Sequence, residues 1–128
     1  MLRTRKIFAT AINCIDGRFQ KPLLDFITGK FRVDYVDMVT EPGPDKILSE
    51  NEAAGIIESI KRRVLISVQK HASKIVIIAG HYGCAANQVE EKEHKRQIAQ
   101  AVDNIKRWNL EVDVYGAWLG ADRKAELI

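Results

Sequence analysis

The segment Lys74-Ile75-Val76-Ile77-Ile78-Ala79-Gly80 is the strongest structural signal in this chain of 128 residues. A continuous apolar run of this length, rich in β-branched residues, is typical of a strand at the centre of a parallel sheet, where helices cover both faces. The run His81-Tyr82-Gly83-Cys84 follows it directly. We therefore expect a buried central strand whose carboxyl end carries two candidate metal ligands.

Strands and helices are predicted to alternate on both sides of this segment. We expect strands at 6–14, 33–39 and 110–117, and helices at 19–30 and 89–108 whose apolar residues recur at spacings of three and four. Residues 40–45 contain two prolines around a glycine and are expected to form a loop. Ser49 to Glu52 match a capping box, which predicts the start of a long helix that ends near His71. Residues 118–128 are expected to form a closing turn and tail.

The alternation predicts an α/β fold of three layers. Its centre would be a mostly parallel sheet of about four to five strands in the order 2-1-3-4, with helices on both faces. A chain of 128 residues is long enough to bury one core, so residues 1–128 are expected to form a single domain.

The composition is that of a compact globular protein, with 46% hydrophobic and 29% charged residues. Its 20 basic and 17 acidic residues give a net charge of only +3, so we do not expect nucleic-acid binding. The densest basic groups, 61–63 and Arg3, Arg5 and Lys6, are expected to be solvated. The apolar run 7–12 is too short to span a membrane and precedes no cleavage site, so we expect a cytoplasmic protein without membrane contact.

The only two cysteines lie in two short polar runs that follow predicted strands. Cys14 ends the first strand, and His81 and Cys84 follow the central one. In open parallel sheets, ligands bind at the carboxyl ends of neighbouring strands whose connections leave on opposite faces, so the two runs can meet. Two thiolates and one imidazole suit zinc, and three protein ligands leave a fourth position for water or substrate. His71 and His94 lie on predicted helices without a motif and are expected to be exposed.

Asp16 and Arg18 follow Cys14 closely enough to take part in the same site. Asp16 can reach the metal or its bound water, and Arg18 can hold the carboxylate in a bidentate pair. The pair would act as a switch: Asp16 on zinc closes the fourth position, and Asp16 on Arg18 opens it. Because two thiolates cancel the charge of zinc, an acceptor such as Asp16 would help orient the bound hydroxide, and activity should rise with pH.

Other interpretations of the same residues stay open. Cys14 could be a small buried residue at the end of a strand, and Asp16 with Arg18 could stabilise a turn through an ion pair. A redox pair of Cys14 and Cys84 is less favoured, because there is no Cys-x-x-Cys motif and Arg18 offers only general help to a thiolate.

The pattern Cys-x-Asp-x-Arg followed by His-x-x-Cys resembles that of the β-class carbonic anhydrases, which hydrate carbon dioxide to bicarbonate at a zinc ion. The resemblance extends over 52–80 and 114–128. It implies that Cys14, His81 and Cys84 are the zinc ligands and that Asp16 and Arg18 gate the fourth position. It also implies carbon dioxide and bicarbonate as substrate and product, and a homodimer or higher homo-oligomer.

Several segments depart from the family pattern. Only about five residues precede the first strand, where the family has a helical arm, and 40–44 replace the usual Asn-Ala-Gly loop. Ala85 stands where glycine is common, and the segment before the last strand is shortened. The leading hypothesis is reversible hydration of carbon dioxide by zinc-bound hydroxide. The alternatives are a zinc enzyme for another small electrophile, such as carbon disulfide or carbonyl sulfide, and a non-catalytic zinc-binding protein.

Overall fold

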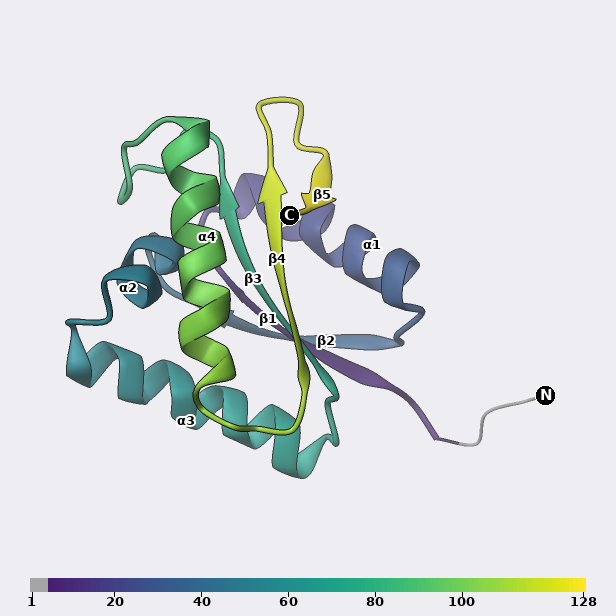
Figure 1. The fold of residues 1–128 in the computed structure, drawn as a ribbon. Coiled ribbons are helices and arrows are strands. Elements are labelled where there is room, and N and C mark those ends of the chain that lie inside the picture. The colour runs from purple at the N-terminus through teal and green to yellow at the C-terminus, as the bar shows by residue number, and fades with distance from the viewer. Residues whose placement is uncertain (1–4) are drawn as a thin grey trace.

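The computed structural model describes residues 5–128 and shows an α/β fold in which a five-stranded sheet separates two helical layers (Figure 1). The order of elements confirms the predicted alternation of strands and helices. In chain order the elements are β1 (Phe8–Asn13), the 3₁₀ turn η1 (Gly17–Phe19), α1 (Gln20–Phe31), β2 (Tyr35–Thr40), α2 (Pro44–Glu50), α3 (Ala54–Lys70), β3 (Ile75–His81), α4 (Glu91–Lys106), β4 (Asp113–Leu119) and β5 (Ala125–Leu127).

The sheet has the strand order β2-β1-β3-β4-β5, which confirms the predicted order of the first four strands. These four are parallel, and β1 pairs with β3 so that Thr10 lies opposite Val76 and Ile12 opposite Ile78. The fifth strand is antiparallel to β4 and lies within the segment expected to be a turn and tail. The central position of β3 explains its continuous apolar sequence, because neighbouring strands and helices enclose it on all sides.

The helices lie on both faces of the sheet, as predicted (Figure 1). Helix α1 covers one face, where Leu23 and Ile27 pack against Ala11, Ile77 and other buried residues of the strands. Helices α2, α3 and α4 cover the opposite face, and their apolar residues form a second core with the strands. Within residues 5–128, no helix is both long enough and apolar enough to cross a membrane.

The segment between β2 and α3 differs from the prediction. Residues that were expected to form a loop begin α2, with Pro44 in its first turn, where a missing amide hydrogen is tolerated. Ser49 lies in the last turn of this helix and donates its hydroxyl to the carbonyl of Lys46. Asn51, with φ of 57°, then ends α2 in the left-handed conformation. The predicted capping box is therefore wrong, and α3 begins after Ala53 without a side-chain cap.

The basic residues that were expected to be solvated are only partly so. Arg5 and Lys6 are exposed, and Arg3 lies outside the described residues. Arg63 is half-buried and forms an ion pair with Glu41, so it joins α3 to the end of β2. This guanidinium therefore stabilises a contact between elements instead of forming part of a free basic surface.

Candidate metal centre

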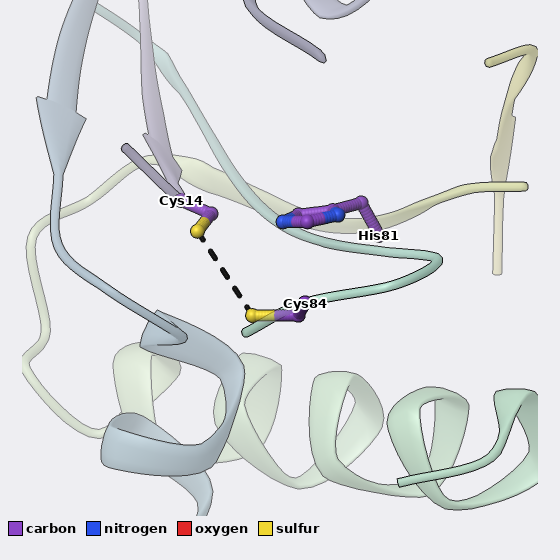
Figure 2. Close-up of side chains that lie close together, drawn as sticks. All are labelled: Cys14, His81 and Cys84. Carbon is purple, nitrogen blue, oxygen red and sulfur yellow. Dashed lines mark hydrogen bonds between the residues drawn. The ribbon is translucent and has the colours of Figure 1, made fainter. Parts of the chain in front are cut away.

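Three candidate ligands meet at the carboxyl ends of β1 and β3. Cys14 directly follows β1, His81 is the last residue of β3, and Cys84 lies in the segment that follows. Because the two strands are parallel neighbours, their carboxyl ends lie at the same edge of the sheet. The Sγ atoms of Cys14 and Cys84 are 4.0 Å apart, and one ligand atom from each of the three residues lies within 4.8 Å of the others. Figure 2 shows the three side chains converging on one small space.

The imidazole of His81 is oriented with one nitrogen toward this space. Its Nδ1 donates to the carbonyl of Tyr82 at 2.8 Å, which leaves the lone pair on Nε2. The ring stacks on Phe19, with 4.3 Å between the ring centroids. Nε2 is buried and has no hydrogen-bond partner among the described residues. A buried nitrogen without a partner is unfavourable, and a cation bound to it would supply the missing interaction. The donor set therefore fits a metal ion.

The two thiols complete a set that suits a borderline-soft cation. Both cysteines are free and buried, with exposed fractions of 8% for Cys14 and 4% for Cys84. Burial, assisted by the neighbouring Cys14, raises the pKa of the Cys84 thiol to about 11. The metal-free thiol is thus protonated near neutral pH, and a metal that binds the thiolate must displace this proton. Two sulfurs and one imidazole nitrogen match the donors that zinc binds in proteins.

Asp16 and Arg18 lie beside the three candidate ligands as a bidentate ion pair. Arg18 donates from Nη2 to Oδ2 of Asp16 at 2.6 Å and from Nε to Oδ1 at 3.1 Å, and its backbone amide also donates to Oδ1. These bonds lower the pKa of Asp16 to about 2. Oδ2 of Asp16 lies 4.0 Å from Nε2 of His81. The carboxylate is therefore ionised and held by Arg18 at the edge of the ligand group.

Gln20 fixes the chain on the Cys14 side of the site, a role that was not predicted from the sequence. Its side-chain amide Nε2 lies 2.7 Å from the carbonyl oxygen of Cys14, 3.0 Å from Oδ1 of Asn13 and 3.2 Å from the carbonyl of Asp16. These contacts join the start of α1 to the turn that carries the first motif. The sequence signal for this role is the glutamine in the first turn of the helix that follows the Cys14 to Arg18 motif.

The two other histidines behave differently from each other. His71 is exposed at the end of α3, as expected, and pairs with Asp37 at 2.6 Å. The expectation for His94 is wrong, because only 1% of its surface is exposed and its Nδ1 donates to Oδ2 of Asp45 at 2.7 Å. His94 lies one turn before Ile98, on the apolar stripe of α4 that faces the core. That spacing was a signal for burial.

Comparisons with known proteins give one family and one fold. A model of the family described as "Putative carbonic anhydrase" matches residues 4–128. Among solved structures, one of the two tetrameric β-carbonic anhydrases from Sordaria macrospora is 12% identical, with a TM-score of 0.54, and the match covers 97% of this chain and 81% of that one. The β-carbonic anhydrase CafA of Aspergillus fumigatus is 13% identical, with a TM-score of 0.49 and coverage of 97% and 76%. No curated protein sequence matches the chain. The first of these structures shows a shared fold.

Proposed function

The chain belongs to the carbonic anhydrase family, and we propose that it is a zinc-dependent enzyme for the reversible hydration of carbon dioxide to bicarbonate. The observation that carries the proposal is the group formed by Cys14, His81 and Cys84, in which Nε2 of His81 is buried without a hydrogen-bond partner among the described residues. Three protein donors are typical of catalytic zinc sites, whereas structural sites usually have four.

Each residue of the site has a distinct part in this proposal. Cys14, His81 and Cys84 would hold the zinc ion. The bound ion supplies a Lewis acid that makes water a nucleophile near neutral pH. Nδ1 of His81, by donating to the carbonyl of Tyr82, keeps the ring in the tautomer whose Nε2 can bind a metal.

Asp16 and Arg18 would orient water and keep the site open. Because its pKa is about 2, Asp16 stays ionised at physiological pH and can only accept hydrogen bonds. It can therefore align the O–H bond of a water molecule so that an oxygen lone pair faces the substrate. Arg18, by holding the carboxylate, keeps Asp16 off the metal and leaves the fourth position for water.

The space beside the candidate ligands favours a small substrate. A cavity of about 10 Å³ is lined by Cys14, His81, Phe19 and other buried residues. A space of this size is about the minimum that holds one water molecule. So little room beside the ligands excludes a bulky substrate there.

We also propose that the protein is a homo-oligomer in the cytoplasm. The related enzymes from Sordaria macrospora are tetrameric. Ile15 and Tyr82, which flank Cys14 and His81 in the sequence, are 59% and 57% exposed, and apolar side chains of this size favour a covered environment. A reducing compartment would keep the two thiols available for metal binding.

The proposal is tested by measuring zinc content and the rate of carbon dioxide hydration on the purified protein. We expect about one zinc per chain and a rate that rises with pH. Cys14→Ala and His81→Ala should each lose both the zinc and the acceleration. His71→Ala is the matched control, because this exposed histidine lies outside the site and its loss should leave both unchanged.

The two measurements separate the alternatives. A wild-type protein that holds zinc but does not accelerate hydration would exclude the carbon dioxide hydratase. Turnover of carbonyl sulfide or carbon disulfide by that zinc-loaded protein would then identify an enzyme for another electrophile, and its absence would indicate a non-catalytic zinc-binding protein. A protein that takes up no zinc would contradict the proposed metal centre itself.

A further inference from the structure

Cys84 differs from the other two candidate ligands in how it is held. Cys14 directly follows β1, and His81 is the last residue of β3. The sheet therefore fixes the backbone at both residues. Cys84 lies between β3 and α4, in a segment of turns without a helix or strand. The amide of Tyr82 donates to the carbonyl of Leu119 near the start of this segment. The position of Cys84 must therefore depend on contacts made further along the same segment.

Asn87 makes the main contacts of that segment. Only 2% of its surface is exposed, and its backbone amide donates to the carbonyl of Cys84 at 3.3 Å. Its side-chain Nδ2 donates to Oδ1 of Asp45 at 3.0 Å and to Oε1 of Gln97 at 2.6 Å. Both side-chain hydrogens are thus used, one toward α2 and one toward α4. Asn87 joins the Cys84 segment to two helices.

The side chain of Asp45 is in turn fixed by hydrogen bonds and packs against β3. Its Oδ1 also accepts the backbone amide of Lys46, and its Oδ2 accepts Nδ1 of His94 at 2.7 Å. Asp45 and His94 are each 1% exposed. The carboxylate packs directly on Gly80, where an added Cβ would lie 2.5 Å from Oδ2. The side chain is held from three sides next to the residue that precedes His81.

Stability alone does not require a buried carboxylate and imidazole, because apolar residues of similar volume stabilise a core at least as well. Hydrogen bonds of this kind fix the orientation and separation of the bonded side chains more closely than apolar packing does. We propose that Asp45, oriented by His94, is a positioning residue of the metal centre that acts through Asn87 to hold Cys84 beside Cys14 and His81. This inference rests on the proposed metal binding by these three ligands.

The test uses Co²⁺ as a spectroscopic probe on the full chain. Asn87→Ala should weaken Co²⁺ binding by about 10-fold to 100-fold and reduce the sulfur-to-cobalt charge-transfer absorption, because Cys84 is no longer held at the ion. Asp45→Asn should act in the same direction, since its single oxygen cannot serve both Asn87 and His94. Gln97→Ala leaves the contact between Asn87 and Asp45 in place and is a milder variant, expected to show a smaller loss.

Asn104→Ala is the matched control. Asn104 is also a buried asparagine that contacts α2, and its Nδ2 donates to the carbonyl of Leu48 at 2.7 Å, at the end of α2 away from Asp45. Its loss should lower stability while leaving the affinity and the absorption of bound Co²⁺ unchanged. A purely structural role for Asn87 would make the two alanine variants alike.

Hydrogen exchange of the metal-free chain separates failure of this inference from failure of the proposed function. In Asn87→Ala and Asp45→Asn, the amides of residues 84–89 should exchange about tenfold faster, whereas Asn104→Ala should leave them unchanged. Unchanged exchange, or unchanged Co²⁺ affinity and absorption in a wild-type chain that binds Co²⁺, would overturn the inference. A wild-type chain that binds no Co²⁺ would refute the metal function, and the exchange rates would still decide whether Asp45 holds the loop. If Asn87→Ala does not fold, both measurements are made on Gln97→Ala, which is expected to shift in the same direction.

Discussion

Arg18 controls the charge state of Asp16, a carboxylate that lies beside the candidate metal ligands. Its guanidinium bonds stabilise the ionised form, and this holds the pKa of Asp16 near 2. Because the pKa is lower in the folded chain than in the unfolded one, the pair stabilises the fold above about pH 4. This contribution is lost as the pH falls from about 4 toward 2.

Arg18→Ala should therefore raise the pKa of Asp16 toward its ordinary value of 3.8. Carbon NMR titration of the Asp16 side chain measures this directly. Arg96→Ala is the control, because Arg96 forms a similar bidentate pair with Glu93 on the surface of α4, away from the site. A pKa of Asp16 that stays near 2 without Arg18 would show that another group stabilises the carboxylate.

At the scale of single residues, the sequence identified the group at the carboxyl ends of β1 and β3 because short motifs encode it. Cys14 and Asp16 share one run, and His81 and Cys84 share another, so the parallel pairing of β1 with β3 brings the two runs to the same edge of the sheet. The buried hydrogen bonds among Asp45, Asn87 and His94 were not predicted, because their partners are distant in the chain. His94 contacts Asp45, 49 residues away, and such a pairing leaves no local signal beyond the position of His94 on the apolar stripe.

Among the elements, α2 shows where local sequence patterns were misleading. Two prolines and a glycine predicted a loop, yet Gly43 in the left-handed conformation starts a helix of seven residues and Asn51 ends it. The capping box at Ser49 matched in residue type only, since a motif of four residues carries no information about the helix that precedes it. Helix α4 was predictable because many residues repeat one helical pattern, and β3 because its continuous apolar run is typical of a buried strand.

Two glycines in different elements should respond to alanine in opposite ways. Gly80→Ala in β3 would place a Cβ 2.5 Å from Oδ2 of Asp45 and 3.0 Å from Cδ1 of Ile98. We expect a loss of about 1–3 kcal/mol in the free energy of unfolding, as for other overpacked cores. Gly29→Ala in α1 meets no atom within 4 Å and should stabilise the helix by up to ~1 kcal/mol. Urea unfolding measures both, and a neutral Gly80→Ala would show that Asp45 can move away from β3.

For the whole molecule, metal binding and proton release should be linked. Zinc that binds the folded chain but not the unfolded one should, at one hundred times its Kd, add about 2.7 kcal/mol of stability, or roughly 10 °C in Tm for a chain of this size. The gain should increase between pH 6 and pH 8, because the Cys84 thiol, with a pKa near 11, must lose its proton to bind.

Thermal unfolding with and without zinc, followed at several pH values, checks this expectation. Cys84→Ala should lose the zinc-dependent rise in Tm, and His71→Ala should keep it. A rise of the same size in Cys84→Ala would mean that zinc stabilises the fold from another place.

Without zinc, the raised pKa of Cys84 predicts that stability falls as the pH increases from about 9 toward 11.

The pairing of β1 with β3 has a consequence for how the chain folds. Cys14 and Cys84 are 70 residues apart in sequence. They meet only when β1 and β3 pair, with β2 and the intervening helices in the loop between them. Closing so long a loop carries an entropic penalty, which makes contacts of this range slow to form. The nascent chain therefore passes through a period in which its two thiols are separate, and they come together only once β1 and β3 have paired.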